Sequence, residues 1–248
     1  MFPVIRGVAS AIPNSIVTNT ELVKRYPKIL SQERIIEKCG IVERRSVRGE
    51  MTCSELAVKA IENLIANTNL KSSEIDLVIL ATLTPDCFFP STAALIIDKL
   101  GLEVANGYDT GAACSGFIYG IDDACCRLWA GGPYKDRWRK IVVCSSEIMS
   151  STLNAFDYRT GLLFGDAASA VLIERGDVES SGFKINNTLT KMVKDHVGEV
   201  YFKSPFGLQS GEKWDDQKFE LDGRNVYRHA VDLIVEFLRE YQEKFNLN

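Results

Sequence analysis

The stretch that decides the fold is GYDTGAACSGFIY, from Gly107 to Tyr119. Residues 103–109 are typical of a strand that enters a turn of small residues, and the apolar residues after the turn predict a helix with Cys114 in its first turn. Backbone N–H groups at a helix start lack intrahelical partners and carry about half a positive charge, so they favour a thiolate over a thiol. Cys114 is therefore a candidate nucleophile, and the alternative is a small cysteine buried in the core.

Strands and helices alternate around this stretch. The apolar runs 77–81 and 141–144 predict strands that are covered on both faces. Thr52 to Glu55 is a capping box that opens a helix, and Pro90 is expected to be the first residue of another helix, which ends at Gly101. The β-α-β-α-β order favours an α/β fold with a mostly parallel sheet and helices on both faces.

The helix after Cys114 is expected to be central and buried, because apolar residues cover much of its circumference. These residues are Phe117, Ile118, Ile121, Ala124, Cys125 and Leu128. Asp122 and Asp123 interrupt the apolar surface and must find partners. The adjacent pair Cys125 and Cys126 is interpreted as helix packing.

The pattern changes after Gly176. Residues 183–189 are strand-like, 190–216 predict a polar loop, and 224–245 predict a helix with one apolar stripe. The stripe consists of Tyr227, Ala230, Val231, Ile234, Phe237, Leu238 and Tyr241. We expect exposed apolar surface there, which another chain could cover.

Composition limits the class of protein. The 248 residues are 46% hydrophobic and 25% charged with a net charge of −4, which indicates a globular protein without the basic footprint of nucleic-acid binding. No apolar run approaches the roughly 18 residues of a membrane span, and the N-terminus lacks a signal-peptide pattern. Seven cysteines without metal-ligand spacing favour reduced thiols in the cytoplasm and no metal site. Two short basic clusters are interpreted as solvated loop charge: Arg44-Arg45-Arg48 and Lys135-Arg137-Arg139-Lys140.

Five segments, in chain order, carry a resemblance to a known family. They are Gly40 to Arg44 (G-I-x-E-R), Phe89-Pro90-Ser91, Asp109 to Phe117 (D-T-G-A-A-C-S-G-F), Phe164 to Ala167 (F-G-D-A) and Leu221 to Tyr227. Together they resemble β-ketoacyl-acyl-carrier-protein synthase III, a condensing enzyme of the thiolase superfamily. The resemblance implies a thiolase-like layered α-β-α fold, with a complete first half at 1–176 holding a mostly parallel five-stranded sheet. Residues 177–248 would be the incomplete start of the second half.

The family resembled works through a Cys-His-Asn triad. The resemblance implies that Cys114 accepts an acyl group from acyl-coenzyme A and passes it to malonyl-acyl carrier protein in fatty acid biosynthesis, without a cofactor. No P-H-Q segment occurs, and neither His196 nor His229 has the family's surroundings, so neither is assigned a catalytic role. His229 is expected on the polar flank of its helix with Glu236 and Glu240. This chain is therefore expected to be inactive in condensation by itself.

Two other readings of the cysteine stay open. The first is a non-catalytic subunit or pseudoenzyme that holds a partner. The second is a thioesterase-like or redox cysteine protein, which the sequence favours least because it shows no positioned base or resolving cysteine. Partners implied by the resemblance are acyl carrier protein, coenzyme A thioesters and a second copy of the chain, with no nucleic acid and no membrane.

The resemblance also implies substrate-binding residues. Lys38 occupies the family's phosphate-contact position, and Arg34 stands where the family often has an adenine-stacking Trp. In the later D-R-x-T segment, Tyr158 and Arg159 follow Asp157, so that Arg34 and Tyr158 would sandwich the base with exchanged roles. The alternative is surface loop residues and an acyl-carrier-protein donor.

Two aromatic residues are implied to shape the acyl pocket. Phe89 resembles the residue that crosses the dimer to close the partner's pocket, and Phe164 resembles a residue that lines the pocket. Both are equally compatible with a plain core position.

Overall fold

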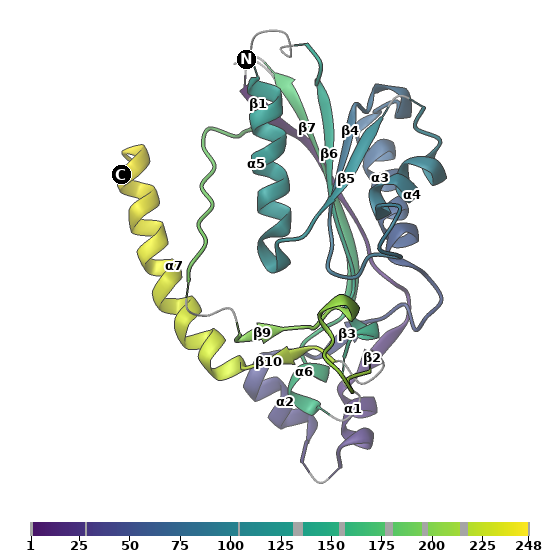
Figure 1. The fold of residues 1–248 in the computed structure, drawn as a ribbon, viewed down its shortest axis with the longest axis vertical. Helices are drawn as coiled ribbons and strands as arrows, with labels where there is room; N and C mark the ends of the chain where they lie inside the picture. Colours follow the sequence, from purple (N-terminus) through teal and green to yellow (C-terminus); the bar gives the residue numbers. More distant parts are fainter. Residues whose placement is uncertain are drawn as a thin grey trace. The chain divides into compact units, whose positions relative to one another are not determined.

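The computed structural model in Figure 1 describes residues 2–27, 29–103, 105–130, 136–153, 157–176, 181–194, 198–213 and 218–247. The chain forms two compact units. Unit 1 comprises Met1–Val17, Glu43–Met149 and Gly165–Thr190, and unit 2 comprises Thr18–Val42, Ser150–Phe164 and Lys191–Asn248. The domain boundary after residue 176 stays a prediction.

A mixed sheet forms the centre of unit 1. Its strands are β1 (Phe2–Ala11), β4 (Leu77–Ala81), β5 (Asn106–Thr110), β6 (Lys140–Ile148), β7 (Asp166–Gly176) and β8 (Phe183–Lys184), in the order β5-β4-β6-β7-β1-β8. β4 is parallel to β5 and to β6, whereas β7 is antiparallel to β6 and to β1. Among the five longer strands, β1, β4, β5 and β6 therefore share one direction and β7 opposes them, which confirms the mostly parallel sheet.

Strand β8 is shorter than the predicted strand 183–189. It pairs with Val4 and Ile5 of β1. The two strands are antiparallel, so the residues after Lys184 run toward the beginning of β1, where the Ile185 N–H donates to the Pro3 carbonyl at 2.9 Å. Strand β1 begins at Phe2, so the later residues of the predicted strand have no part of β1 beside them.

Helices cover both faces of this sheet, as Figure 1 shows: α3 (Cys53–Thr68) and α4 (Thr92–Leu100) on one side and α5 (Gly116–Trp129) on the other. One core cluster joins α3 to the sheet through Leu56, Ile61 and Leu64. A second cluster joins α5 to the sheet through Ala124 and Leu128. All five residues of β4 are buried, as predicted for a strand covered on both faces.

The caps of α3 and α4 show one correct prediction and one error. The capping box of Thr52 and Glu55 is present at α3. Helix α4 begins at Thr92 rather than at Pro90, because the Ser91 hydroxyl accepts the Ala94 N–H and makes Ser91 the N-cap. The Phe89-Pro90 peptide bond before this cap is cis.

The prediction that this helix, α5, is central and buried holds for only one of its faces. Its buried residues are Gly116, Gly120, Ala124, Cys125 and Leu128, which form the face that packs on the sheet, and Ile118 is 48% exposed. A Cβ on Gly120 would lie 2.8 Å from Val143 Cγ1, so only glycine allows this close approach of helix and sheet. Nothing among the described residues covers the opposite face completely.

The two acidic residues of α5 have partners. Asp122 accepts a hydrogen bond from the Thr188 hydroxyl. Asp123 accepts from the Tyr108 hydroxyl and from Arg127 Nε, the latter at 3.0 Å.

The first basic cluster is only partly solvated loop charge, because Arg44 is buried whereas Arg48 is exposed. The guanidinium groups of Arg44, Arg45 and Arg48 donate to carbonyl oxygens of β2 (Ile16–Thr18) and of the segment before it. The acceptors are Val17, Pro13 and Ile16, at 3.3, 3.3 and 3.1 Å. Strand β3 (Glu43–Arg45), which carries two of these arginines, pairs with β2. Backbone carbonyls that the sheets leave unpaired need such donors.

The second basic cluster is only partly described, because Lys135 lies outside the described residues. Lys140 is paired with Glu74 at 2.9 Å and with Glu174 at 3.6 Å, so it also differs from the predicted solvated charge.

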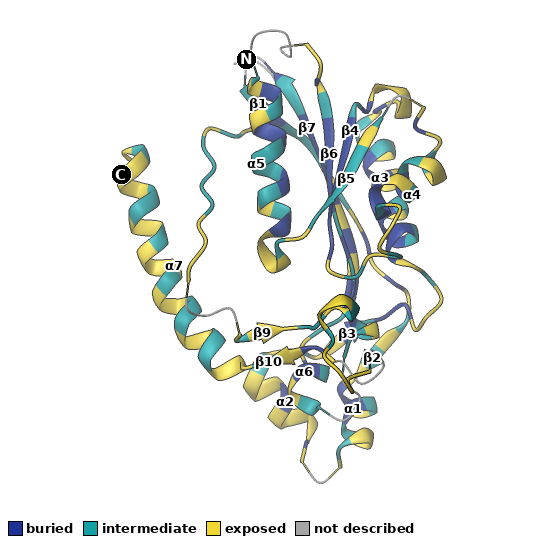
Figure 2. Cartoon of the chain, viewed as in Figure 1, coloured by how far each residue is buried: buried dark blue, intermediate teal, exposed yellow. Residues whose placement is uncertain are grey.

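Unit 2 contains α1 (Asn19–Arg25), α2 (Gln32–Cys39), α6 (Tyr158–Gly161), the strand pair β9 (Val200–Tyr201) and β10 (Glu220–Leu221), and α7 (Gly223–Phe245). Figure 2 shows that α7 is coloured intermediate or exposed along its length, and none of its described residues is buried. Tyr227 and Ile234 of the apolar stripe are 75% and 57% exposed. The predicted exposed apolar surface near the C-terminus is therefore present in this structure.

Among the described residues, no helix combines the length and the hydropathy that crossing a membrane requires. Within the same residues, no group of three or more His, Cys, Asp or Glu side chains is placed to hold a metal ion. All seven cysteines are free in this structure.

Candidate active site

Cys114 lies in a tight turn between a strand and a helix. Strand β5 ends at Thr110, a 3-10 turn spans Ala113–Ser115, and α5 begins at Gly116. Cys114 is therefore two residues before the helix instead of in its first turn, and it is exposed. The predicted place in the first helical turn is therefore wrong by two residues, and the alternative of a buried core cysteine is excluded.

The backbone of the turn is strained at the residue before the cysteine. Ala113 has a φ of +47°, a left-handed conformation that is costly for a residue with a Cβ. Such conformations cost about 1–3 kcal/mol and gather at functional sites, where the surrounding structure imposes them. The Ser115 N–H donates to the Ala112 carbonyl at 3.1 Å and closes the turn. No sequence pattern marks Ala113, because alanine usually avoids this conformation.

The turn lies at the carboxyl ends of the parallel strands. Ala81 of β4 is in register with Thr110 of β5 and with Ser145 of β6. Gly116 approaches β4 so closely that a Cβ on it would be 3.2 Å from Ala81 Cβ. The carboxyl edge of parallel strands is where open α/β sheets place their ligands, so this position suits a reactive side chain.

The other thiols near the sheet are unsuited to nucleophilic chemistry. Burial raises the pKa of Cys53 to about 11 and that of Cys125 to about 12, and it also raises the pKa of Cys144. For Cys126, partial burial and the nearby carboxylates of Asp122 and Asp123 raise the pKa. The thiolate is the reactive form, so these four cysteines are disfavoured relative to an exposed thiol in a turn.

The residues implied to bind coenzyme A lie in unit 2. Arg34 and Lys38 are exposed on α2, and the Arg34 guanidinium donates to the Ile29 carbonyl at 3.2 Å. The Tyr158 ring on α6 packs edge-on against Tyr26, with 6.4 Å between the ring centroids.

These contacts do not assemble a base-binding clamp. Arg159 is exposed and pairs with Asp157 through Nε at 3.1 Å. Among the contacts of the described residues, none joins Arg34 to Tyr158. The adenine sandwich therefore stays a prediction.

The two aromatic residues differ in exposure. Phe89, in unit 1, is 82% exposed, so a plain core position is excluded for it. Phe164, in unit 2, is half-buried, and its ring packs edge-on against Phe219 at a centroid distance of 5.2 Å. Their implied roles around an acyl pocket stay predictions.

The structure corrects the prediction for one of the two histidines. His229 is half-buried, and its Nδ1 lies 2.6 Å from Glu199 Oε1, so it is not the solvent-facing residue that was predicted. A carboxylate on the segment before β9 reaches this flank of α7, which the helical pattern alone cannot show. Glu236 and Glu240 share Lys191 as partner, at 4.0 and 2.6 Å. His196 lies outside the described residues.

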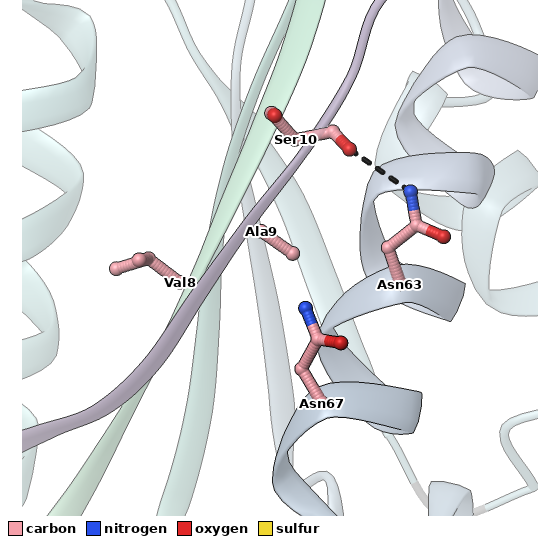
Figure 3. Close-up of a pocket in the computed structure, with 5 residues that line it drawn as sticks. All are labelled: Val8, Ala9, Ser10, Asn63 and Asn67. Atoms are coloured by element: carbon pink, nitrogen blue, oxygen red, sulfur yellow. Dashed lines mark hydrogen bonds between the residues drawn. The ribbon is translucent and has the colours of Figure 1, made fainter.

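Figure 3 shows a pocket that involves none of the candidate residues. It has a volume of about 450 Å³ and is lined by Val8, Ala9, Ser10, Asn63 and Asn67, from β1 and α3. The Asn63 amide donates to the Ser10 carbonyl at 2.9 Å, which covers part of the open edge of β1.

The layered α/β fold, with an exposed cysteine at the carboxyl edge of its parallel strands, can be compared with known proteins of the same architecture. The family model of 3-oxoacyl-(acyl-carrier-protein) synthase III matches residues 108–191, which include the cysteine turn. A β-ketoacyl-(acyl-carrier-protein) synthase III from Clostridium acetobutylicum is 34% identical over 246 residues, covering 98% of this chain and 72% of the relative. The relative of the same name from Streptococcus mutans is 35% identical over 231 residues, covering 93% and 68%.

Solved structures agree. The crystal structure of 3-oxoacyl-(acyl-carrier-protein) synthase III from Aquifex aeolicus is 31% identical with a TM-score of 0.81, and the match covers 99% of this chain and 73% of that one. The priming β-ketosynthase of the R1128 polyketide pathway is 27% identical with a TM-score of 0.85, covering 96% and 69%. The chain belongs to the β-ketoacyl-acyl-carrier-protein synthase III family, and its fold is thiolase-like.

Proposed function

We propose that the chain is an acyltransferase of the β-ketoacyl-acyl-carrier-protein synthase III type, in which Cys114 accepts an acyl group from a coenzyme A thioester. The observation that carries this proposal is the exposed Cys114 in a strained turn at the carboxyl edge of the sheet. A thiol suits this chemistry because it is both a nucleophile and a leaving group. The names of the relatives support the same reaction class.

The loading step balances without any resident cofactor. The Cys114 thiolate attacks the thioester carbonyl carbon, the tetrahedral oxyanion collapses, and the coenzyme A thiolate leaves and takes up a proton. The backbone N–H of Cys114 is a donor for the oxyanion. In the second step, the enolate formed from malonyl-acyl carrier protein by loss of carbon dioxide attacks the acyl group, and the Cys114 thiolate leaves.

We assign only the loading step to this chain by itself. The second step needs two neutral donors at the enolate oxygen, which are His and Asn in the family resembled. His229 is not assigned this role, because its Nδ1 lies 2.6 Å from Glu199 Oε1. Condensation in fatty acid biosynthesis is thus the role of the family, and acyl loading is the part proposed for these residues.

The remaining site residues follow as proposals. Lys38 and Arg159 supply positive charge for coenzyme A phosphates, and Arg34 and Tyr158 supply flat surfaces for its adenine. Phe89 is exposed enough to reach a second copy of the chain in a homodimer, and Phe164 lines the acyl pocket. Acyl carrier protein is the partner for the second substrate, and the cytoplasm is the compartment.

Intact-protein mass spectrometry after incubation with acetyl-coenzyme A tests the loading step. We expect a single acetyl adduct on the wild type and on Cys126→Ser, the matched control on α5, and none on Cys114→Ser. An adduct on Cys114→Ser, or none on the wild type with acetyl or longer acyl groups, would contradict the proposal. Release of a β-ketoacyl product from malonyl-acyl carrier protein would contradict the restriction to loading.

A second candidate function is a non-catalytic subunit that holds a partner. The observation that favours it is the apolar stripe on α7, where no described residue is buried. Absence of any acyl adduct, together with a stable complex that buries this stripe, would replace the first proposal by the second.

A further inference from the structure

We propose that Glu147 is a positioning residue for the cysteine turn, a role that rests on the acyl transfer proposed above. Glu147 is the penultimate residue of β6, at the same edge of the sheet as the turn. Its Oε1 accepts the Leu83 N–H at 2.8 Å, and its Oε2 accepts the Thr84 hydroxyl at 2.9 Å. Charge-assisted hydrogen bonds of this kind are about twice as strong as neutral ones, so the carboxylate holds the loop after β4 in one place.

The loop that Glu147 holds is also tied to the backbone of β6. The Thr84 hydroxyl oxygen accepts the Ile148 N–H at 2.9 Å, and the Thr84 N–H donates to Thr82 Oγ1 at 3.1 Å. The Thr82 hydroxyl donates to the Ser146 carbonyl at 2.8 Å. Thr82 and Ser146 are buried, so no bulk water replaces these bonds when one is lost.

The last residue of β4 and the first residue of this loop contact both ends of the cysteine turn. The Thr82 N–H donates to the carbonyl of Thr110, four residues before Cys114, at 3.4 Å. On the other side, Ala81 forms the surface against which Gly116 packs, two residues after Cys114. A shift of Ala81 and Thr82 therefore moves both flanks of the turn that presents the sulfur.

A charged carboxylate at this half-buried position loses part of its hydration, which costs free energy. Desolvation raises the pKa of Glu147, and the hydrogen bonds from Leu83 and Thr84 only partly oppose it. A perturbed carboxyl at the edge of a candidate site is a feature that functional positions share. The strand pattern of β6 gives no sign of it, because Glu147 follows the apolar run as any solvent-facing residue would.

Single-turnover acylation of Cys114 and peptide-mapped alkylation by iodoacetamide test this role on the full chain. We expect Glu147→Ala to slow acylation at saturating acetyl-coenzyme A at least 30-fold, with a less than threefold change in half-saturation. Cys114 alkylation should slow at least fivefold. Glu147→Gln keeps the shape and a carbonyl acceptor, and it should recover most of both rates.

Glu74→Ala is the matched control. Glu74 also accepts one backbone N–H, from Lys71 at 3.0 Å, and one side-chain donor, Lys140 Nζ at 2.9 Å, but it lies in the 3-10 turn Ser72–Glu74, beside the first residue of β6. This variant should leave both rates within twofold of the wild type. If Glu147→Ala fails to fold, Thr84→Val removes one donor of the same pair and should reproduce the slower rates in part.

The outcomes separate this proposal from the proposed function. Rates for Glu147→Ala equal to those of Glu74→Ala would overturn the positioning role, as would a loss in half-saturation alone. Absence of acylation in the wild type would overturn the proposed function, whereas the alkylation rates would still decide whether Glu147 positions Cys114.

Discussion

Helix α3 in unit 1 and helix α7 in unit 2 both carry an apolar stripe, yet their burial differs completely. Leu56, Ile61 and Leu64 of α3 have no exposed surface, whereas Ile234 on the α7 stripe is 57% exposed. α3 packs on the sheet through a closed cluster, and α7 has no such surface beneath it among the described residues. An amphipathic pattern thus predicts where a helix is apolar, and the presence of a covering surface decides whether that face contributes to stability.

The largest effect on the free energy of unfolding is expected in the core around α3. We expect Ile61→Ala to lower the free energy of unfolding by about 2–5 kcal/mol, because it deletes buried methyl groups and leaves a cavity. Urea unfolding followed by circular dichroism at pH 7.5 measures this change. A loss below about 1 kcal/mol would mean that the core around α3 collapses without cost, contrary to its full burial.

The pH dependence of stability tests the burial of Cys53, the first residue of α3. Burial raises the pKa of Cys53 from its ordinary value of 9.0 to about 11. The unfolded chain therefore releases this proton near pH 9 while the folded protein keeps it, so stability falls as the pH rises from 9 toward 11. Between pH 8.5 and 10.5 the thiol should account for a loss of roughly 2 kcal/mol.

Cys53→Ser isolates this contribution, because a serine hydroxyl donates to the Ser146 carbonyl as the thiol does at 3.2 Å but does not titrate. The variant should lose less stability than the wild type over the same pH interval, measured by urea unfolding. Equal losses in the two proteins would show that Cys53 is solvated in the folded state.

The smallest effect is expected on α7. Ile234→Ala should change the free energy of unfolding by less than about 0.5 kcal/mol, as for other substitutions at exposed positions. The measurement is the same urea unfolding, run beside Ile61→Ala so that one residue type is compared in two settings. A loss above 1.5 kcal/mol that grows with protein concentration would show that a second copy covers the stripe.

Most elements of the fold could be predicted because they depend on local signals. The capping box at Thr52, the buried strand 77–81 and the long helix after Gly223 are set by hydrogen-bonding side chains and periodicity within a few residues. One error was local: α4 begins after its N-cap Ser91 and not at Pro90, and Asp109 of β5 adds an acceptor for the Thr92 N–H. The other errors concern contacts between distant segments.

The features of the candidate site also divide into those that the local sequence predicts and those that it does not. Cys114 could be found from its neighbours, since small residues between a strand and a helix already indicate a turn that exposes a side chain. The contact of His229 with Glu199 and the hydrogen bonds of Glu147 could not be found, because each needs a partner from another part of the chain. The left-handed conformation of Ala113 could not be found either, because alanine usually avoids it.

The sequence by itself determined the order of the main strands and helices along the chain, the position of the candidate thiol and the family, because these depend on short stretches of adjacent residues. Only the tertiary structure decided which apolar faces are covered, which arginines bind backbone carbonyls and which carboxylate binds the loop after β4. Burial and hydrogen bonding between segments depend on distances in space, and those distances exist only once the sheet has formed.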